Sequence, residues 1–552
     1  MKPSSIVQTI LSVSEDAQHG MYFINDEHEN FVSYKDFIGR AISLLRLLNR
    51  NDVNSGSMLV IQTINPQATL LLIWACFLGG ITPVPCAISY SHDHLEFLKV
   101  VSKTLSRPQM IFNNRFYMYL AKMARNDDKD ISILDKVEID EDAILNLQPT
   151  EIDSVEVEVA DIVQRLILFS SGTTGTPKGV VYSDKNLIAN ISIVSQTIGF
   201  SSLDSLMSWL PLNHILGLSL HFIATWNKVN QVVLPTGQFL QDPDSWLKGI
   251  SRHHITVSVS PNFGYKLCLD KVISENINLS SLRLLIMGAE PTSLQLINDF
   301  FERFSRFGLD PNAIATGYGL TEAQMVTMTQ VGQKFNTICI DRTHMAIGDT
   351  LNLISKNNSN GVKCVSQGAV YNCFSLTIED EKNRILPEDT IGLVHLAGSS
   401  IANSYLTMEG KKSIIGNDQT FNTLDIGFLH KGQLYITGRQ KDMIIINGEN
   451  LFIQDIDYFL ETLSDLEGLR AIGVNYKKDD SDKIAILVLE PEKMSLNKQK
   501  EIRKKLNVAI SRHFTLKVDN ILFVDKLLTT TTGKIMRNAN FNLYRDHITA
   551  KQ

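Results

Sequence analysis

Residues 165–179 read RLILFSSGTTGTPKG, an apolar run followed by a loop rich in glycine and hydroxyl side chains. The run RLILF predicts a buried strand, and VVYSDKNL after the loop predicts the start of a helix. Glycines let the backbone approach a ligand closely, and hydroxyl groups with one Lys complete a typical phosphate cradle. The loop is not a Walker P-loop, because Pro177 stands where that pattern needs its second glycine. The alternative, a flexible linker, is disfavoured by the position directly after a strand. The candidate phosphate-binding residues are Ser171, Gly172, Thr173, Thr174, Gly175 and Lys178.

Apolar, β-branched runs recur on both sides of this stretch, with amphipathic segments between them. Strands are predicted at 58–64, 165–171, 231–236, 255–261 and 282–288, and a helix at 294–308. Alternating strands and helices favour an α/β fold with largely parallel sheets. A compact α+β unit is predicted after 432–442, with a helix at 453–464, a strand at 483–491 and a Lys-rich helix at 495–513. We therefore expect a large N-terminal domain of stacked α/β subdomains at 1–438 and a small α+β domain at 439–552. Residues 331–363, polar and rich in Asn, are interpreted as an insertion or an irregular loop.

Composition excludes several classes of protein. The chain has 552 residues, 44% of them apolar and 20% charged, with a net charge of −7. That charge disfavours binding to nucleic acid or to an anionic membrane as the main function. The six cysteines form no CxxC pair and are expected to be reduced core residues of a cytoplasmic protein. No signal peptide is recognised at the N-terminus.

Residues 68–88 carry no charge and reach the length of a membrane span. Gly79, Gly80, Pro83 and Pro85 interrupt the stretch near its middle. A buried helix at 68–78 followed by a buried strand at 81–88 is therefore expected instead of a span.

A second motif, GYGLTEA, occupies residues 317–323. Tyr318, flanked by Gly317 and Gly319, offers a flat ring on which a base can stack. Glu322 offers a carboxylate for Mg²⁺, which nucleotide sites typically hold through one or two carboxylates and phosphate oxygens. Taken alone, the heptad is equally well explained as an ordinary strand and turn.

Two further motifs lie toward the C-terminus. In LDIGFL (424–429) and YITGRQKDMIIINGEN (435–450), Asp425 can accept hydrogen bonds from a vicinal diol such as ribose, and Arg439 can add a charge-assisted bond. Lys441 sits at the expected domain boundary, where a hinge would act. In TTTTGKIMRN (529–538), Lys534 can reach a phosphate or carboxylate oxygen. The alternative for this last motif is a solvated basic turn.

Together and in this order, the four motifs resemble those of the adenylate-forming superfamily, which includes acyl-CoA synthetases, adenylation domains of nonribosomal peptide synthetases and luciferases. The resemblance extends from about residue 20 to about residue 545. Within that superfamily the sequence is most similar to fatty acyl-AMP ligases. This finer match is carried by SWLPLNHILGL (208–218), SVSPNFGYKLC (258–268), LLIMGAEPTSLQLINDFFERF (284–304), DMIIINGENLFIQDID (442–457) and the insertion after GYGLTEA.

The resemblance implies a role for each matched residue. The loop residues Ser171, Thr173, Thr174 and Lys178 would bind pyrophosphate, and Thr321 and Glu322 would contact phosphate and Mg²⁺. The adenine pocket would comprise Gly288, Ala289, Glu290 and Tyr318, and Gly319 would also belong to the cofactor-binding site. Asp425 and Arg439 would hold the ribose, Lys441 would be the hinge of a mobile C-terminal domain, and Lys534 would stabilise the adenylation transition state. His214 would lie beside the acyl site.

The implied reaction uses ATP and Mg²⁺ to convert a fatty acid to acyl-AMP, and then transfers the acyl group to an acyl carrier protein in lipid, polyketide or nonribosomal-peptide biosynthesis. Some residues depart from the pattern. Gly448-Glu449-Asn450 is closer to acyl-CoA ligases, Leu528-Thr529 replaces Pro-Lys, and Asp184 stands where His is common. An acyl-CoA synthetase is therefore the alternative. A non-catalytic nucleotide-binding protein is disfavoured because Lys178, Glu322, Asp425 and Lys534 are all present.

Overall fold

A computed structural model describes the chain at residues 3–25, 28–90, 94–126, 130–132, 134–151, 162, 164–170, 177–290, 292–356, 358, 360–446, 449–461, 463, 469–478, 481–490, 494–514, 516, 518–529 and 535–549. The chain divides into two units that alternate along the sequence. Unit 1 comprises Met1–Phe335, Gln367–Ser375 and Leu396–Phe421, and unit 2 comprises Asn336–Ser366, Leu376–His395 and Asn422–Gln552. The expected boundary between residues 438 and 439 remains a prediction.

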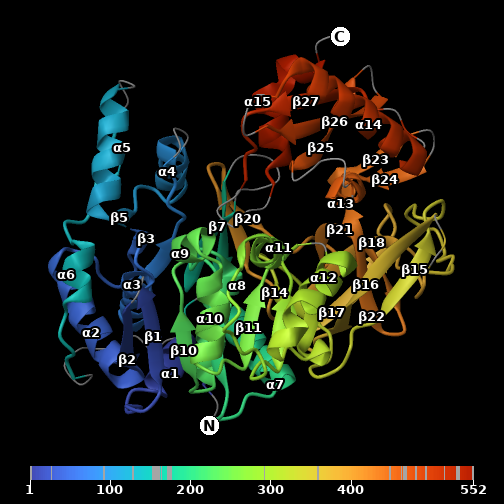
Figure 1. Cartoon of the computed structure of the whole chain (residues 1–552). Helices are drawn as coiled ribbons and strands as arrows, with labels where there is room; N and C mark the ends of the chain where they lie inside the picture. The colour runs from blue at the N-terminus through green and yellow to red at the C-terminus, as the bar shows by residue number, and fades with distance from the viewer. Residues whose placement is uncertain are drawn as a thin grey trace. The chain divides into compact units, whose positions relative to one another are not determined.

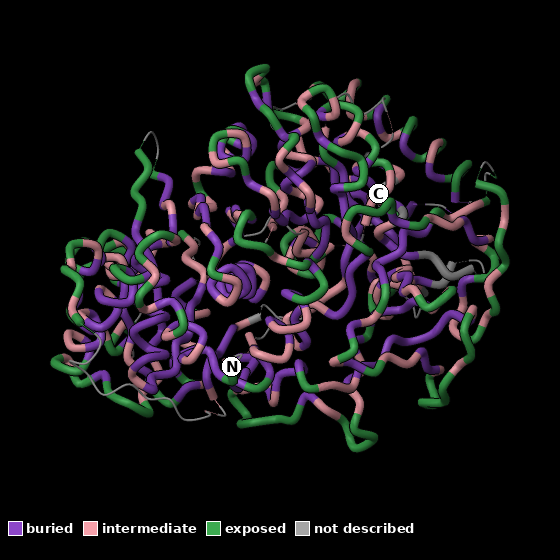
Figure 2. Tube along the Cα trace, turned by 90° about the horizontal axis from the view of Figure 1, so that it is seen from below, coloured by how far each residue is buried: buried purple, intermediate pink, exposed green. Residues whose placement is uncertain are grey.

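A mostly parallel sheet organises unit 1. Its strand order is β14-β13-β12-β11-β9-β10-β1-β2, in which β13 to β1 are parallel neighbours. The strands are β1 (Gly20–Asn25), β2 (His28–Ser33), β9 (Ser205–Ser208), β10 (Asn230–Val233), β11 (Val257–Ser260), β12 (Leu284–Met287), β13 (Ile314–Leu320) and β14 (Gln324–Met328). The apolar runs predicted at 231–236, 255–261 and 282–288 supply β10, β11 and β12, which confirms the α/β expectation. Figure 2 shows that buried residues concentrate in the interior of the trace and exposed ones on its outer turns.

Helices accompany these strands, as Figure 1 shows. They are α1 (Ile6–Leu11), α2 (Tyr34–Arg50), α7 (Asp184–Ile198), α8 (Ile215–Trp226), α9 (Thr236–Gln241), α10 (Asp244–Arg252), α11 (Asn262–Lys271) and α12 (Leu294–Phe304), with 3₁₀ turns η2 (Ser305–Phe307) and η3 (Pro311–Ala313). The helix predicted at 294–308 corresponds to α12 and η2.

A smaller parallel sheet of unit 1 explains the uncharged stretch at 68–88. Its order is β4-β3-β5-β6, formed by β3 (Met58–Gln62), β4 (Thr82–Pro85), β5 (Gln109–Phe112) and β6 (Asp135–Lys136), with helices α3 (Pro66–Leu78), α4 (His94–Thr104), α5 (Asn114–Asn126) and α6 (Glu141–Leu145). Every residue of α3 after Pro66 is buried, which is why this helix is apolar on all sides. The predicted helix and strand are thus confirmed as α3 and β4. No helix among the described residues is both long and apolar enough to cross a membrane.

The third sheet of unit 1 corrects the expectation for the glycine-rich loop. Strand β7 (Leu166–Ser170) is antiparallel to β8 (Lys178–Tyr182), with Ser170 opposite Lys178, and the sheet order is β20-β19-β8-β7. The helix that VVYSDKNL was expected to start is α7, but the run VVY at its beginning forms strand β8, because β-branched and aromatic side chains favour a strand. The helix α7 begins at Asp184, where the Ser183 side chain and Asn186 form a capping box. The strands β19 (Ser404–Thr407) and β20 (Gly410–Ser413) complete this sheet.

A buried ion pair connects this sheet to α7. The Arg165 Nη2 lies 2.7 Å from the Asp184 Oδ2, and neither side chain is exposed. Asp184 also accepts a hydrogen bond from the backbone N–H of Ile6 (2.8 Å), at the start of α1. Asp184 stands at the position where the resembled family commonly has His. Its carboxylate connects α7 with the start of α1 and with Arg165 before β7.

Unit 2 contains β15, β22 and most residues of β16, β17, β18 and β21, which pair in the order β17-β18-β21-β22-β16, with β15 paired to β16. The strands are β15 (Thr337–Asp341), β16 (Gly361–Val370), β17 (Phe374–Glu379), β18 (Gly392–Gly398), β21 (Phe421–His430) and β22 (Gln433–Arg439). The expectation of an irregular loop at 331–363 is wrong for the run TICID, which forms β15 and pairs in register from Thr337–Val365 to Asp341–Gly361. After β15, the Arg342 guanidinium lies 5.0 Å from the centroid of the Phe514 ring.

The C-terminal part of unit 2 has the predicted α+β character. It comprises η4 (Gln440–Asp442), β23 (Met443–Ile446), β24 (Glu449–Phe452), α13 (Ile453–Glu461), β25 (Ala471–Lys478), β26 (Ser481–Leu489), α14 (Leu496–Phe514), β27 (Asn520–Val524) and α15 (Arg537–Thr549). The sheet β25-β26-β27 has one core formed with α13 and α14 and another formed with α15. The helices expected at 453–464 and 495–513 are α13 and α14, and the strand expected at 483–491 is β26.

The cysteines are core residues, as expected. All six are free thiols; Cys373 is partly buried and the other five are buried. Burial raises the pKa of the Cys86 thiol to about 12, so that this thiol stays protonated and unreactive at neutral pH.

Candidate active site

Lys178 and Glu322 meet at one tyrosine, Tyr405 of β19. Strand β19 is antiparallel to β8, with Tyr405 opposite Val180, two residues after Lys178. The Lys178 Nζ lies 5.5 Å from the centroid of the Tyr405 ring, a cation–π contact. The Tyr405 hydroxyl donates a hydrogen bond of 2.7 Å to the Glu322 Oε1. One side chain therefore holds the lysine of the loop motif and the glutamate of the GYGLTEA motif.

The turn that carries Thr321 and Glu322 is held by its backbone. The Ala402 N–H donates to the Glu322 carbonyl at 2.7 Å, and the Tyr182 hydroxyl donates to the Thr321 carbonyl. Gln324, at the end of the turn, has a left-handed φ of 63° and donates through its Nε2 to the carbonyl of Asn186 at 3.0 Å. The turn is therefore fixed by strand β8, helix α7 and the segment before β19.

Burial keeps both phenols of this site protonated. Burial, and then the Glu322 carboxylate, raise the pKa of the Tyr405 hydroxyl far above its ordinary value. The same two causes, in the same order, raise the pKa of the Tyr182 hydroxyl. Both hydroxyls therefore act as hydrogen-bond donors throughout the physiological pH range.

The Glu322 carboxylate fits a divalent cation. Its Oε1 accepts from Tyr405, and its Oε2 accepts no hydrogen bond within the described part of the chain. At nucleotide sites Mg²⁺ is typically held by one or two carboxylates, while phosphate oxygens and water supply the other ligands.

Loop residues Ser171, Gly172, Thr173, Thr174 and Gly175 lie outside the described residues. Their described neighbours are Ser170, the last residue of β7, and Pro177, which precedes β8. Their assignment to phosphate stays a prediction, and Lys178 is the described member of the motif.

The residues predicted to bind adenine come from two neighbouring parallel strands. Met287 of β12 is paired with Thr316 of β13, so that Gly288-Ala289-Glu290 and Gly317-Tyr318-Gly319 continue from adjacent strands. A side chain at Gly319 would lie 2.3 Å from the carbonyl oxygen of Gln324, so only glycine fits there. Tyr318 is half-buried, and Ala289 has a left-handed φ of 66°.

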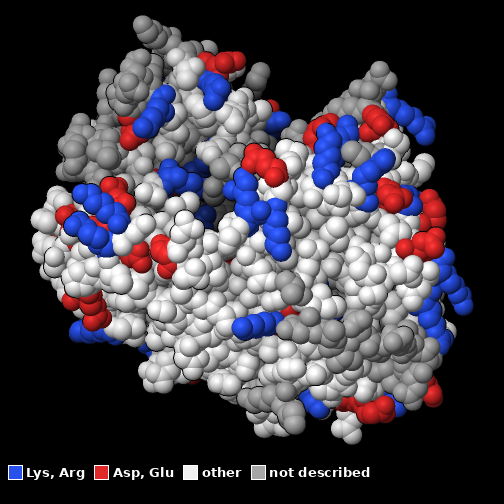
Figure 3. All heavy atoms as spheres, turned by 180° about the vertical axis from the view of Figure 1, so that it is seen from behind, with Lys and Arg blue, Asp and Glu red and all other residues white. Residues whose placement is uncertain are grey.

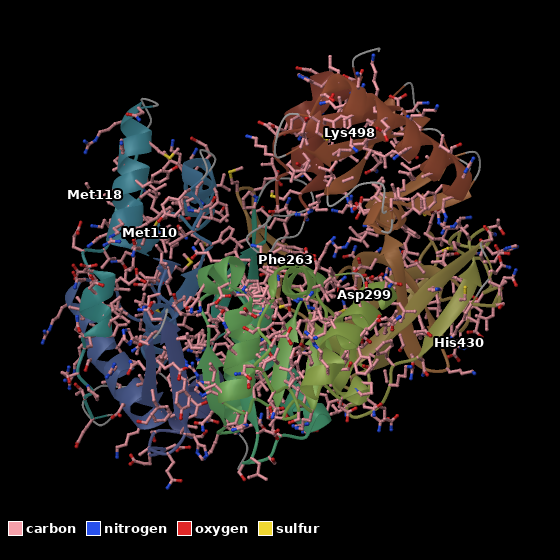
Figure 4. The ribbon with its side chains drawn as sticks, viewed as in Figure 1. Met110, Met118, Phe263, Asp299, His430 and Lys498 are labelled. Carbon is pink, nitrogen blue, oxygen red and sulfur yellow. The ribbon has the colours of Figure 1, made fainter. Side chains whose placement is uncertain are left out.

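Glu290 has a structural partner in addition to its predicted role. Its Oε2 accepts a hydrogen bond of 3.0 Å from the backbone N–H of Phe263, in the first turn of α11. A carboxylate is favourable at that helix terminus. Figure 4 shows Phe263 on this helix.

His214 is the N-cap residue of α8, and its Nδ1 accepts a hydrogen bond of 3.3 Å from the Leu216 N–H. The segments carrying His214, Phe263, Glu290 and Tyr318 follow or end the parallel strands β9, β11, β12 and β13. Ligands of α/β proteins bind outside the carboxyl ends of parallel strands. Leu218 and Phe222 lie in α8, the helix that His214 caps. Both side chains are fully buried and belong to the core.

In unit 2, the two residues predicted to bind ribose form an ion pair. Asp425 of β21 is opposite Arg439 of β22, and the Arg439 Nε donates to the Asp425 Oδ1 at 2.8 Å. The carboxylate is buried, whereas 35% of the Arg439 side chain is exposed. Lys441 is exposed in η4, directly after β22.

Lys534 lies outside the described residues. The loop that carries it is closed by a bridge between Thr529 and Ile535. The catalytic role of Lys534 therefore stays a prediction.

Sequence reasoning missed Tyr405 and Tyr182. Tyr405 lies in IANSYL (401–406), which carries no recognisable motif, and its place in the site depends on the pairing of β19 with β8. Tyr182 lies in the run that was expected to start a helix. The β-branched and aromatic run VVY was the available signal for Tyr182, and it is equally typical of an ordinary strand.

Comparisons with known proteins found a matching family and similar proteins and structures. A family model described as AMP-binding enzyme matches residues 14–406, more than half of the chain. A 4-hydroxyphenylalkanoate adenylyltransferase of Mycobacterium tuberculosis (strain ATCC 25618 / H37Rv) is 27% identical over 406 residues, and a medium-chain-fatty-acid–[acyl-carrier-protein] ligase, JamA, of Moorena producens (strain JHB) is 29% identical over 402 residues. The alignments cover 69% and 67% of this chain, and 65% and 66% of those proteins. The chain thus spans about two thirds of the length of these relatives.

A solved structure from work on fatty acyl-adenylate ligases of E. coli and L. pneumophila has a TM-score of 0.86 and 22% identity, and the match covers 99% of each chain. At that identity the likeness shows the fold alone. The fold of this chain is therefore that of the adenylate-forming enzymes.

Proposed function

This chain belongs to the family of AMP-binding enzymes, and from that premise we propose that it activates a fatty acid as an acyl adenylate. The fatty acid carboxylate attacks the α-phosphorus of ATP, a new oxygen–phosphorus bond forms, and the bond to the β-phosphate breaks with its electron pair leaving on pyrophosphate. The observation that carries the proposal is the contact of Lys178 with Tyr405 and the hydrogen bond of Tyr405 to Glu322, which bring the charged residues of two motifs to one side chain. The fatty acid follows from the sequence resemblance, and the name of the JamA relative supports it.

The residues of the enzyme act by position and charge, as phosphoryl-group chemistry requires. Lys178 would neutralise charge on the departing pyrophosphate, and Glu322 would hold Mg²⁺, which offsets phosphate charge when it is bound. Asp425 and Arg439 would hold the ribose. Lys534 would stabilise the charge on the α-phosphate and the incoming carboxylate. No general base is needed, because a carboxylic acid is already ionised at neutral pH.

The second half-reaction in our proposal transfers the acyl group to the phosphopantetheine thiol of an acyl carrier protein. The thiolate attacks the acyl carbon, a thioester forms, and AMP leaves. Rotation about Lys441 would withdraw Lys534 and admit the thiol. The insertion after GYGLTEA and the carrier protein in the name of the JamA relative favour this acceptor, whereas Gly448-Glu449-Asn450 favours CoA.

Hydroxylamine trapping of the adenylate, with a panel of fatty, short-chain and aromatic acids, tests the first half-reaction. We expect hydroxamate from fatty acids, and Lys534→Ala should lower its formation ~10²-fold or more, as for loss of one electrostatic stabiliser. Lys526→Ala, an exposed lysine before the same loop, is the matched control and should keep the wild-type rate. If Lys534→Ala forms hydroxamate at the wild-type rate, Lys534 is not catalytic. If the wild-type enzyme forms hydroxamate from none of the acids, the proposed activity is wrong.

Offering CoA and a phosphopantetheinylated carrier protein to enzyme charged with acyl adenylate tests the acceptor. We expect a thioester on the carrier protein. Thioester on CoA alone would establish the acyl-CoA synthetase instead.

A further inference from the structure

Helix α14 concentrates positive charge in an acidic chain. Its nineteen residues, Leu496–Phe514, include six Lys or Arg and a single Glu, which gives a net charge of +5 with His513 neutral. The whole chain has a net charge of −7. The local and the overall charge of the protein are therefore opposite in sign.

The exposed side of α14 has a regular order. Leu496, Lys500, Lys504, Val508 and Arg512, here called the basic row, follow one another at intervals of four residues, and such residues are neighbours on a helix surface. All five are exposed, Leu496 to 75% and Val508 to 42%. The opposite row of Ile502, Leu506, Ile510 and Phe514 is buried in the core. Figure 4 shows α14, with Lys498 labelled.

The cations of the basic row are not neutralised by neighbours. Lys505 is paired with Glu501 at 3.1 Å, and the Arg503 guanidinium lies 5.6 Å from the Phe523 ring centroid. Lys500, Lys504 and Arg512 form no ion pair with any residue that the structure describes. Figure 3 shows basic and acidic side chains scattered over one face of the molecule. Unpaired cations on a folded helix are available to a partner.

We propose that the basic row is the docking surface for the acyl carrier protein, and that it contacts an acidic helix of that partner. The inference rests on the proposed function, and it names the surface at which the acyl acceptor binds. An acidic carrier would be repelled by a chain of charge −7 unless a local positive surface attracts it, because at physiological ionic strength charges are felt over ~8 Å. Exposed Leu496 and Val508 give the row two apolar contacts, which suits a protein partner better than a free anion.

Reversal of the three cations tests the proposal in the full-length enzyme. The variant Lys500→Glu/Lys504→Glu/Arg512→Glu should form acyl adenylate at the wild-type rate, measured by hydroxylamine trapping. Its kcat/KM for the carrier protein should fall about 10-fold or more, mainly through KM, because electrostatic steering changes association rates by that order. An unchanged thermal unfolding midpoint will show that the variant is folded.

Helix α5 offers a matched control. Arg115, Lys122 and Arg125 are exposed, lie on one helix, and form no ion pair with residues of the described ranges. Arg115→Glu/Lys122→Glu/Arg125→Glu changes the net charge equally and should leave transfer to the carrier unaffected. A carrier variant with Lys in place of acidic residues on its docking helix should restore transfer by the α14 variant.

The outcomes separate this inference from the proposed function. Wild-type transfer together with equal transfer by the α14 variant would overturn the docking surface and leave the function intact. If the α14 variant loses acyl transfer to CoA and keeps transfer to the carrier, the basic row would be assigned to binding of the CoA phosphates. Binding of wild type, and not of the α14 variant, to anionic lipid vesicles without any effect on transfer would assign the row to a membrane. Absence of transfer by the wild type to any carrier would instead contradict the proposed acceptor.

Discussion

Tyr405 shows what residue-level reasoning from sequence can and cannot reach. Lys178 and Glu322 stand in motifs whose composition indicates phosphate and Mg²⁺ chemistry. Tyr405 joins these two side chains in space, yet its own surroundings, IANSYL, resemble any half-buried strand. Its role becomes visible only when β19 is placed antiparallel to β8. Candidate ligands were therefore predictable, and the residue that positions them was not.

Tyr405→Phe tests this positioning role. Phenylalanine keeps a ring over Lys178 and removes the hydrogen bond to Glu322. A hydrogen bond to a charged group contributes about 1.5–3 kcal/mol, so adenylate formation should fall about 10-fold or more. The Mg²⁺ concentration for half-maximal rate should rise, because the carboxylate is no longer held in place. Both are measured by pyrophosphate exchange over a Mg²⁺ titration.

Tyr371→Phe is the control for removing a buried hydroxyl in the same unit, since the Tyr371 hydroxyl contacts the Met325 Sδ at 3.3 Å. It should keep the wild-type Mg²⁺ dependence. If Tyr405→Phe has the same rate and Mg²⁺ requirement as wild type, Tyr405 does not position Glu322.

At the scale of elements, strands and helices were predicted correctly where one periodicity of apolar residues dominated the sequence. Apolar runs such as 282–288 gave strands, and the amphipathic run 294–308 gave α12. The predictions missed β8 at 178–182, where the side chains of VVY favour a strand and the expected helix begins only at Asp184. They failed again at 337–341, where Asn-rich flanks concealed the short β-branched run of β15. Short strands are specified by their pairing partners, and the sequence of a single strand does not contain that information.

Helix α8 is tied to its neighbours by a buried histidine. The His221 Nε2 accepts from the Trp74 Nε1 of α3 at 2.8 Å, and the His221 Nδ1 lies 2.8 Å from the Gln231 Oε1 of β10. The ring is therefore neutral, with its hydrogen on Nδ1. Gln231 in turn donates to the Tyr34 hydroxyl of α2 at 2.7 Å. Four elements of unit 1 thus share one hydrogen-bond network.

This network predicts acid sensitivity of folding. Burial lowers the pKa of His221 to about 4, below its ordinary value of about 6.5. Between those values the unfolded chain binds a proton that the folded chain excludes, so the free energy of unfolding falls as pH decreases from about 6.5 to about 4. The loss amounts to about 3 kcal/mol at most, and His94, whose pKa burial also lowers to about 4, changes stability in the same direction.

Urea denaturation at several pH values between 7 and 4 measures this loss. His221→Gln, which does not titrate in the range, should be less stable at pH 7 and should lose less stability on acidification. An equal pH slope in wild type and His221→Gln would show that His221 does not govern the acid sensitivity.

At the scale of the whole molecule, composition and the order of motifs predicted the fold class. They did not predict that the two units alternate along the chain, with parts of β16, β17, β18 and β21 assigned to each. That alternation is a property of strand order, which follows from long-range pairing. Within unit 2, Phe452 packs in one core with Ile426 and Phe428, so residues on both sides of the expected 438/439 boundary share a core.

Overall charge gives the last prediction, which separates a local from a global electrostatic effect. Each Lys or Arg to Glu reversal changes the charge by −2, so the α14 and α5 triple variants both change from −7 to −13. If net charge governed encounter with an acidic carrier, both variants would lose transfer equally. If the basic row governs it, only the α14 variant loses transfer. The attraction exerted by a local cluster of charges extends only about one Debye length from the surface. We therefore expect that only the α14 variant loses transfer.

Salt dependence completes the test. In single turnovers of enzyme loaded with acyl adenylate, raising NaCl from about 0.05 M to about 0.5 M should slow wild-type transfer to the carrier about 10-fold, because screening removes the attraction. Transfer to free pantetheine, a neutral thiol, should be unaffected. The α14 variant should show the opposite sign, with transfer to the carrier faster at high salt, since screening there weakens a repulsion. A wild-type rate that does not change with salt would contradict electrostatic docking at the basic row.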